Sequence, residues 1–450
     1  MMSVNSIILV LVCFIPTYLV LFGGEQMQHQ FHGRISRLAS YDGSGTGESE
    51  LPPEEGIFVY RAYSYEEKNQ TFVRVLAVSD CLYKETIILS FPGYSGKLQL
   101  KSMDGTCPMS WAPNCKFTSF FFISNPLPSA PDDVTLEWKG REITIPVYER
   151  RELKKKLEVC VAPVYWYNDW PRLVMFLELW RNENAKVSIY VNSYSENVQR
   201  VFDYYAKQMD LELIPWPALP KLRHIDPDSS SFRLNQVLSA SDCSLRTDSL
   251  FVSNTDIDEI PFLRNSSLLA YLNQVLREVP NLGSLVFQDT HVHTGHIDST
   301  FDSIQSFNVS KGTAPQKIIY VANRTDTVIV HTIKMKKGYA QRKVSRSQGG
   351  TLHFRNSLTE KYQTSDLGNS SPFTADLTGR CKTAASRIFP DSIPSYTKND
   401  STVPALGRCV NRWRKSGGCM VPLVACRPFL IDHDHWIFVE GTDESHFTLL

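Results

Sequence analysis

The chain has 450 residues, of which 42% are hydrophobic, and it carries 47 basic and 47 acidic side chains. This length and hydrophobic content allow two or three packed domains. The formal net charge of zero gives no electrostatic basis for binding nucleic acid, which needs an excess of positive charge on the protein. We therefore expect no nucleic-acid partner.

The first clear pattern is an apolar run near the amino end. Ile7 to Phe22 carries no charge, and the first charged residue of the chain is Glu25. A run of about 16 to 19 residues approaches the length of a membrane-spanning helix. We predict a transmembrane signal-anchor over residues 1–24. A cleaved signal peptide is the alternative, because no Lys or Arg precedes the run to fix its orientation.

Sequons and cysteines both indicate the secretory lumen. Asn-x-Ser/Thr sequons, which accept glycans on secreted proteins, occur at Asn69, Asn265, Asn308, Asn323, Asn369 and Asn399. Nine of the ten cysteines lie beyond the apolar run, which is typical of an oxidising compartment. Because nine is odd, at least one of these thiols lacks a partner within this part of the chain.

Two regions follow the apolar run. Residues 25–56 are rich in Gly, Ser and Glu and predict a flexible stem. Residues 57–150 predict a small all-β accessory domain, which the cysteines at 81, 107 and 115 could tie together. Its strand candidates are the apolar runs Phe72–Val78, Thr86–Phe91 and Phe117–Ile123. The charged run Glu149–Lys156 then predicts a linker or a solvated helix face.

From Leu157 onward, strands alternate with helices. The strand candidates are Val159–Tyr165, Val187–Val191, Leu211–Ile214 and Leu250–Ser253. The helix candidates lie at about 169–184, 198–205, 232–241 and 268–279. This alternation predicts an α/β domain at residues 157–365, with a mostly parallel sheet flanked by helices. Residues 366–450 predict a cysteine-containing extension.

The acidic segment Asn254–Glu259 follows the fourth predicted strand. Ligands of open α/β sheets bind at the carboxyl ends of the strands. The two carboxylates of Asp256-Ile257-Asp258 can there hold Mg²⁺ or Mn²⁺, which often shares its shell with substrate phosphates. A solvated acidic turn is the alternative for this motif taken alone. Its position in the predicted fold favours a site for a cation and a nucleotide-sugar diphosphate.

Eight short segments occur in the same order as the motifs of a known family. They are Phe72–Leu76, Val159–Pro163, Leu173–Trp180, Val187–Asn192, Leu234–Gln236, Asp242–Arg246, Asp256–Glu259 and Thr351–Arg355. In this order they resemble the motifs of glycosyltransferase family 92, over roughly residues 57 to 365. The resemblance implies a GT-A type fold in a single-pass type II protein of the Golgi membrane, with its catalytic domain in the lumen.

The resemblance also implies an activity. The expected enzyme is an inverting, metal-dependent hexosyltransferase that moves a sugar, galactose first, from a UDP-sugar to a glycan acceptor. Its cofactor is expected to be Mn²⁺ or Mg²⁺. Two departures from the family pattern stand out. Val321–Asp326 replaces an Arg-Pro-Glu element, and Ile260-Pro261 stands where an aromatic residue commonly follows the acidic motif.

The resemblance assigns metal ligands to Asp256, Asp258 and His353. Among these, Asp258 is the principal ligand, and Asp256 lies nearer the ribose or a metal-bound water. Glu259 is expected to orient the loop through contacts with the ligand residues, without binding the metal itself. His331 is the alternative histidine.

Donor binding is assigned to Ala162 and Asn192, at the ends of the first two strands of the α/β region, and again to Asp256. An inverting reaction needs one general base to deprotonate the acceptor hydroxyl. Asp289, one strand beyond the acidic motif, is the candidate by position.

Three other charged segments have plainer interpretations. The cluster His291, His293 and His296 could bind zinc, which makes a secreted zinc hydrolase a competing function, although a solvated loop is the expectation. Asp432–His435 predicts tail surface. The basic segment Lys334–Arg346 could close over a diphosphate, but a solvated loop is favoured.

A catalytically inactive, glycan-binding relative is the remaining alternative to an active enzyme.

Overall fold

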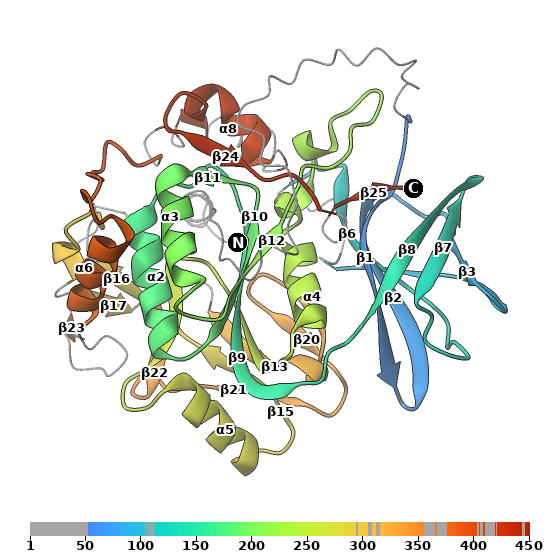
Figure 1. Cartoon of the computed structure of the whole chain (residues 1–450). Helices are drawn as coiled ribbons and strands as arrows, with labels where there is room; N and C mark the ends of the chain where they lie inside the picture. Colours follow the sequence, from blue (N-terminus) through green and yellow to red (C-terminus); the bar gives the residue numbers. More distant parts are fainter. Residues whose placement is uncertain are drawn as a thin grey trace.

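Two large sheets meet at helix α4 (Gln236–Arg246), which contacts strands of both (Figure 1). The computed structural model describes residues 53–103, 105, 107, 112–293, 296–304, 308–311, 316–354, 365–366, 376–402, 405, 408–409, 419, 421–442 and 446–450. The predicted signal-anchor and almost all of the predicted stem lie outside these residues. Among the residues described, no helix is both long and apolar enough to cross a membrane.

The first sheet is built from the amino-terminal part of the described chain. Its strand order is β4-β3-β7-β8-β1-β2-β6-β5, with β25 pairing with β1. The strands are β1 (Phe58–Glu67), β2 (Gln70–Asp80), β3 (Ile88–Phe91), β4 (Tyr94–Lys97), β5 (Gln99–Ser102), β6 (Phe117–Ile123), β7 (Asp133–Trp138), β8 (Arg141–Glu149) and β25 (Thr448–Leu449). The three strand candidates predicted here are confirmed as β2, β3 and β6, although β3 begins two residues later than predicted. Because β25 joins the sheet, this unit includes the chain's last residues.

Strand β2 shows why this sheet packs against the rest of the chain. Successive side chains of a strand point to opposite faces. Val73 and Val75 contribute to the first sheet's own core, whereas Leu76 and Val78 contribute to the main core that continues into the α/β region. The near-continuous apolar run in the sequence therefore reflects a strand buried on both faces.

The second sheet has the order β12-β10-β9-β13-β18-β15-β21. Its strands are β9 (Lys154–Val164), β10 (Lys186–Val191), β12 (Leu211–Pro215), β13 (Ser249–Thr255), β15 (Leu282–Phe287), β18 (Lys317–Val321) and β21 (Ala340–Lys343). Strands β12, β10, β9 and β13 are mutually parallel. Strand β18 runs antiparallel between β13 and β15. The expected α/β class is confirmed, with antiparallel β18 within a sheet that was expected to be mostly parallel. The four strand candidates correspond to β9, β10, β12 and β13.

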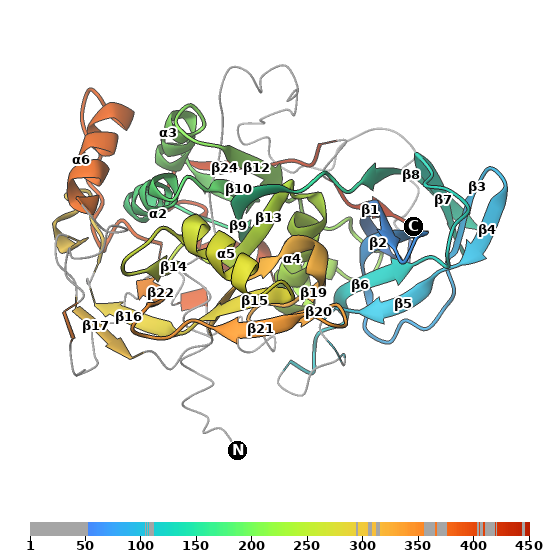
Figure 2. The same ribbon diagram turned by 90° about the horizontal axis from the view of Figure 1, so that it is seen from below.

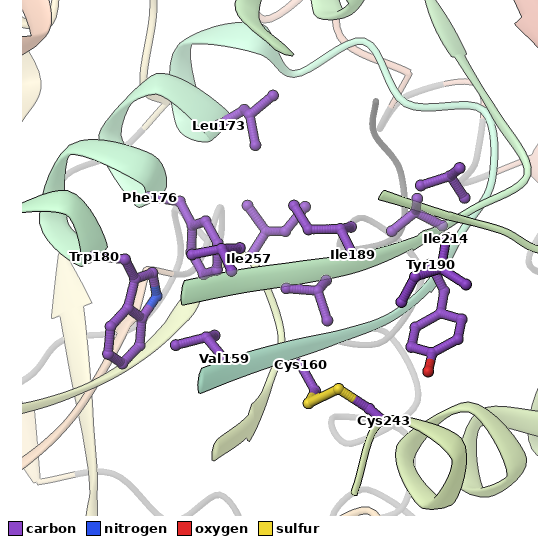
Figure 3. Packing of buried hydrophobic residues seen from close by; sticks show 14 of the residues in the cluster. Val159, Cys160, Leu173, Phe176, Trp180, Ile189, Tyr190, Ile214, Cys243 and Ile257 are labelled. Carbon is purple, nitrogen blue, oxygen red and sulfur yellow. A yellow bond between two sulfur atoms is a disulfide. The ribbon is translucent and has the colours of Figure 1, made fainter. Parts of the chain in front are cut away.

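Helices cover both faces of the second sheet. They are α2 (Trp170–Asn182), α3 (Glu196–Tyr205), α4 and α5 (Leu268–Glu278). Helix α2 begins where Asp169 accepts the backbone N–H of Arg172 at 3.2 Å, and Pro171 occupies its first turn. Figure 3 shows Phe176 and Trp180 of α2 on one side of the strands, and Cys243 of α4 on the other, joined to Cys160 by a disulfide.

A third sheet begins at the last residue of the acidic motif, Glu259. Its order is β14-β22-β16-β17-β23, and Figure 2 shows it at the opposite end of the molecule from the first sheet. The strands are β14 (Glu259–Leu263), β16 (Asp289–His293), β17 (Asn308–Lys311), β22 (Gly349–Phe354) and β23 (Ser365–Asp366). Strand β22 lies between β14 and β16. Glu259 therefore pairs with His353 on one side, and His353 pairs with His291 on the other.

The carboxyl-terminal extension joins these parts. Helix α6 (Leu377–Ile388) packs on α2, and α8 (Pro422–Leu430) precedes β24 (Trp436–Phe438), which pairs with β11 (Ser193–Ser195). Disulfides link Cys81 to Cys107, Cys115 to Cys419 and Cys409 to Cys426. Cys81 and Cys107 thus tie the first sheet region as predicted, but Cys115 bonds the extension instead. Among the described cysteines, Cys381 is free and buried.

Candidate active site

A pocket lies at the carboxyl ends of β9 and β13. Its walls include Val161 and Ala162 from β9 and Asn254 and Thr255 from β13, and Asp256 and Lys317 also line it. The empty volume, which includes space open to solvent, is about 340 Å³. Ala162 and Asp256, two of the three predicted donor-binding residues, thus face one pocket.

Asn192, the third predicted donor-binding residue, lies elsewhere on the second sheet. Its side chain is buried and donates to the carbonyl of Trp216 at 2.9 Å. Its own carbonyl accepts the N–H of Val439, in the carboxyl-terminal extension, at 2.8 Å. In this structure Asn192 ties two segments together, and its predicted contact with a donor stays a prediction.

Helix α4 closes one wall of the pocket after an unusual backbone bend. Gln236 and Ser239 of α4 line the pocket. The three preceding residues, Arg233, Leu234 and Asn235, all have left-handed φ angles between 47° and 57°. Such conformations cost non-glycine residues roughly 1–3 kcal/mol each, and they concentrate at functional sites. The Cys160–Cys243 disulfide, which joins β9 to α4, holds the helix beside the strained bend.

The acidic motif forms a buried turn between β13 and β14. The N–H of Glu259 donates to the carbonyl of Asp256 at 3.0 Å, and the N–H of Phe354 donates to the carbonyl of Asp258 at 2.8 Å. The residues Asp256, Asp258 and Glu259 are 4%, 7% and 4% exposed. The alternative of a solvated acidic turn is therefore wrong. Burying three carboxylates together requires compensating cations.

One compensating cation is Lys317, at the start of β18. Its Nζ lies 2.7 Å from Asp256 Oδ2 and also forms an ion pair with Glu259. Although burial lowers the pKa of Lys317, the two carboxylates outweigh it and raise that pKa above its usual value. Burial raises the pKa of Asp256, with Lys317 opposing the shift. Lys317 is thus a charged side chain held at the floor of the pocket.

His353 lies on the other side of the acidic turn. Its Nδ1 is 3.2 Å from Glu259 Oε1, and its Nε2 is 3.7 Å from Asp258 Oδ2. A carboxylate bound to one imidazole nitrogen fixes the ring orientation and directs the other nitrogen outward, as in histidine ligands of metals. Here the other nitrogen points at the carboxylate that the sequence predicted as the principal ligand.

Arg172, from the first turn of α2, supports the same region. It donates from Nε to Asp169 at 3.0 Å and from Nη1 to the carbonyl of Phe354 at 2.6 Å. Burial raises the pKa of Asp258, while the charges of His353 and Arg172 oppose that rise. The guanidinium thereby fixes the end of β22 beside His353 and adds positive potential near Asp258.

Asp258 and His353 are spaced as two ligands of one divalent cation would be. Two ligands that each lie about 2.1 Å from one ion are about 3.0 to 4.2 Å apart, depending on whether they are adjacent or opposite. The 3.7 Å between Asp258 Oδ2 and His353 Nε2 falls in this range. Asp256 is the weaker candidate, because its Oδ2 is paired with Lys317. Glu158, Cys160 and Cys243 also cluster, but the two cysteines are joined in a disulfide and offer no thiolate.

The predicted general base lies one strand away. In β16, Asp289 pairs with Thr351, two residues before His353 in β22. This register brings its backbone into the third sheet beside the candidate metal ligands. The side chains of Asp289, His291 and His293 lie outside the described residues. His296 is half-buried and stacks on Tyr396 with ring centroids 5.4 Å apart.

The remaining predicted residues take other positions. Burial, aided by the charge of Lys317, lowers the pKa of His331 to about 3, so this histidine near the pocket stays neutral. Asp326, in the segment that departs from the family pattern, pairs with Arg74 at 3.3 Å and Lys101 at 2.6 Å of the first sheet.

The basic segment and the tail motif are largely surface. Lys334, Lys337, Arg342 and Lys343 are exposed, as favoured for a solvated segment, and parts of it form β20 (Ile333–Met335) and β21. In the tail motif, Asp434 accepts a hydrogen bond from Asn168 at 3.0 Å. That contact joins the extension to the residues just before α2.

Comparison with known proteins supports the resemblance. The sequence model of glycosyltransferase family 92 matches residues 155–383, about half of the chain. Among solved structures, residues 1–349 of TarS from S. aureus match at 14% identity with a TM-score of 0.24, over 37% of this chain and 47% of that chain. A search of curated proteins finds no match. The match over half of its length shows that this chain belongs to glycosyltransferase family 92.

Proposed function

We propose that this protein is a metal-dependent glycosyltransferase that uses a UDP-sugar donor. The observation that carries the proposal is the arrangement of Asp258 and His353, 3.7 Å apart, with Glu259 fixing the other nitrogen of the imidazole. Membership of a glycosyltransferase family supports sugar transfer in general. The buried carboxylates beside a pocket at the carboxyl ends of parallel strands fit a GT-A type nucleotide-sugar site.

The residues divide the work of the reaction as follows. Asp258 and His353 would hold Mn²⁺ or Mg²⁺, which neutralises charge on the departing diphosphate. Glu259 keeps the imidazole oriented, and Arg172 adds positive charge behind Asp258. The walls formed by Ala162 and α4 exclude water from the donor, so that the sugar is transferred to the acceptor instead of being hydrolysed.

The proposed stereochemical course is inversion. It requires a base that removes the proton of the acceptor hydroxyl while the hydroxyl attacks the anomeric carbon. Asp289 is the proposed base, since its register position is two residues from that of His353 on the adjacent strand. Galactose is the proposed sugar and a glycan the proposed acceptor, on the strength of the family resemblance.

The proposed location is the Golgi membrane, with residues 1–24 as anchor and the catalytic region in the lumen. Four sequon asparagines, at Asn69, Asn265, Asn323 and Asn399, are exposed, so glycans can be attached there without unfolding the chain. Four disulfides among the described cysteines fit an oxidising compartment.

Donor turnover tests the enzyme function. The full chain, purified in detergent, would be incubated with a panel of UDP-sugars and a mixture of glycan acceptors, with Mn²⁺ or with a chelator. We expect one donor to be consumed, with activity lost in chelator and restored by Mn²⁺. No turnover of any donor, with Asp258→Asn indistinguishable from wild type, would rule the function out.

One observation favours a second candidate, a catalytically inactive relative that binds glycans. Lys317 already pairs with Asp256, and such a cation can replace a metal in an inactive homologue. The same panel separates the two candidates, because the inactive relative would retain glycan binding in chelator and would release no UDP.

A further inference from the structure

Lys317 makes an unusual connection within the candidate site. It is 2% exposed, and its Nζ joins two of the three carboxylates of the acidic turn, Asp256 at 2.7 Å and Glu259. It also lines the pocket together with Asp256. Lys317 opens β18, where its backbone pairs with Phe287 of β15, so β15 as well as the turn holds it in position.

The contacts of Lys317 divide the acidic turn into two parts. Asp256 and Glu259 face the lysine, whereas Asp258 faces His353. A lysine ammonium carries three N–H donors and a localised charge. While it pairs with Asp256 Oδ2, that oxygen is a poor ligand for a cation, since the ammonium competes for the same lone pairs and repels the ion.

We propose that Lys317 is a positioning residue that determines which carboxylates of the acidic turn reach the metal. It occupies Asp256 and Glu259 and thereby restricts the protein ligands to Asp258 and His353. This inference rests on the proposed function, because it concerns the cation of that site. With only two protein ligands, an octahedral ion would keep about four positions for water and diphosphate oxygens.

Removal of the Lys317 charge would change which carboxylates of the acidic turn can reach the metal. Without the charge, Asp256 is a buried carboxylate with a compensating cation missing, and a divalent ion bound at Asp258 is the nearest replacement. Asp256 then becomes a third protein ligand. The ion is held more tightly, and fewer positions remain for the donor diphosphate.

Mn²⁺ binding to the full chain tests this, measured by electron paramagnetic resonance titration of free Mn²⁺ in wild type and variants. We expect Lys317→Met to bind Mn²⁺ at least about tenfold more tightly than wild type. Lys317→Gln, which keeps a donor to Asp256 but no charge, should show the same direction. Lys317→Arg, which keeps the charge, should resemble wild type. In Asp256→Asn/Lys317→Met the gain should disappear, because the third ligand is gone.

The chain offers a matched control in Lys186. This lysine is also buried in the second sheet and also bridges two carboxylates, Glu158 at 3.1 Å and Glu212 at 2.7 Å. It is not among the residues that line the pocket. Lys186→Met should lose stability as Lys317→Met does, since each breaks a buried ion pair, but its Mn²⁺ affinity should equal that of wild type.

The inference is overturned if Lys317→Met and Lys317→Gln bind Mn²⁺ as wild type does, if Lys186→Met shifts the affinity equally, or if no form binds Mn²⁺. Lys317→Gln keeps the test decisive if the methionine variant does not fold. Tighter binding in the Lys317 variants together with no sugar transfer by wild type would support the inference and contradict the proposed function instead.

Discussion

Two buried clusters of charged side chains have contrasting surroundings. The interface cluster consists of Arg61 and Tyr63 of the first sheet, Tyr190 of the second sheet, and Asp242 of α4. The site cluster consists of Asp256, Asp258, Glu259, Lys317 and His353. In the interface cluster, Asp242 accepts hydrogen bonds from Tyr63 and Tyr190 at 2.6 Å each and from Arg61 at 3.2 Å.

The difference lies in what surrounds the carboxylates: Asp256 of the site cluster lines the pocket, whereas Asp242 is not among the residues that line it. The donors to Asp242 come from β1 of the first sheet and β10 of the second, so this cluster forms a junction that holds the two sheets together. In the site cluster, Asp258 and His353 are 3.7 Å apart, which is longer than a hydrogen bond and matches two ligands of one ion. We therefore propose that the pocket beside Asp256, and not buried charge alone, distinguishes the site cluster.

The largest expected effect is that of Asp258→Asn. We expect donor turnover to fall about 1000-fold, because the site loses its anionic ligand. Stability should be unchanged or higher, since burial raises the pKa of Asp258 and its charge is costly in the fold. Turnover rates and thermal unfolding midpoints check both expectations. Full activity in this variant would break the distinction between the clusters.

The interface cluster should respond in the opposite way. Arg61→Met leaves the Asp242 carboxylate without its cation from β1, and breaking a buried pair costs about 3 kcal/mol or more. Urea unfolding measures that loss. The Mn²⁺ affinity of the folded fraction should match wild type. An unchanged free energy of unfolding would show that Asp242 is not the junction inferred from its contacts.

Glu259→Gln sharpens the account of the site cluster. Glu259 holds the Nδ1 of His353, and loss of such a partner lowers metal affinity by about 10- to 100-fold. The variant keeps the side-chain shape but removes one carboxylate partner of the buried Lys317, so it should also lose stability. Titration with Mn²⁺ measures the effect. Equal affinity in the two proteins would mean that Glu259 does not orient the histidine.

The smallest effect concerns Asp228, a buried carboxylate outside both clusters, and the pH dependence of stability. Burial, with the nearby charge of Asp226, raises the pKa of Asp228 to about 7. The folded state therefore binds this proton more tightly than the unfolded state, and wild-type stability should fall as the pH rises from about 4 to 7. Relative to wild type, Asp228→Asn should gain stability at pH 7.5 and lose most of that advantage by pH 5. Melting curves at the two values decide this, and parallel curves would contradict it.

The sequence predicted the central strands because their signals are local. The predicted strands Val159–Tyr165, Val187–Val191 and Leu250–Ser253 correspond to β9, β10 and β13, and the helix start at Asp169 follows from its cap and Pro171. The acidic motif was identified through its position after β13. His353 was identified by resemblance, and its pairing with Glu259 explains how it reaches Asp258.

Other parts depended on contacts between distant segments. The pairing of β14 with β22 joins residues about 90 positions apart, and no local pattern signals it. Lys317 was missed because a lysine that opens the apolar run of β18 resembles an ordinary strand end. The extension after residue 366 showed little periodicity, yet β24 and β25 pair with β11 and β1. Its structure therefore depends on strands that are already formed.

The central claim is that Asp258 and His353 bind one divalent ion in a UDP-sugar site. Anomalous diffraction from crystals of the protein grown with Mn²⁺ and UDP tests it most directly. We predict a manganese peak within about 2.3 Å of Asp258 Oδ2 and His353 Nε2, adjoining the UDP phosphates. A peak at the His291–His296 segment, or no manganese near Asp258, would contradict the account.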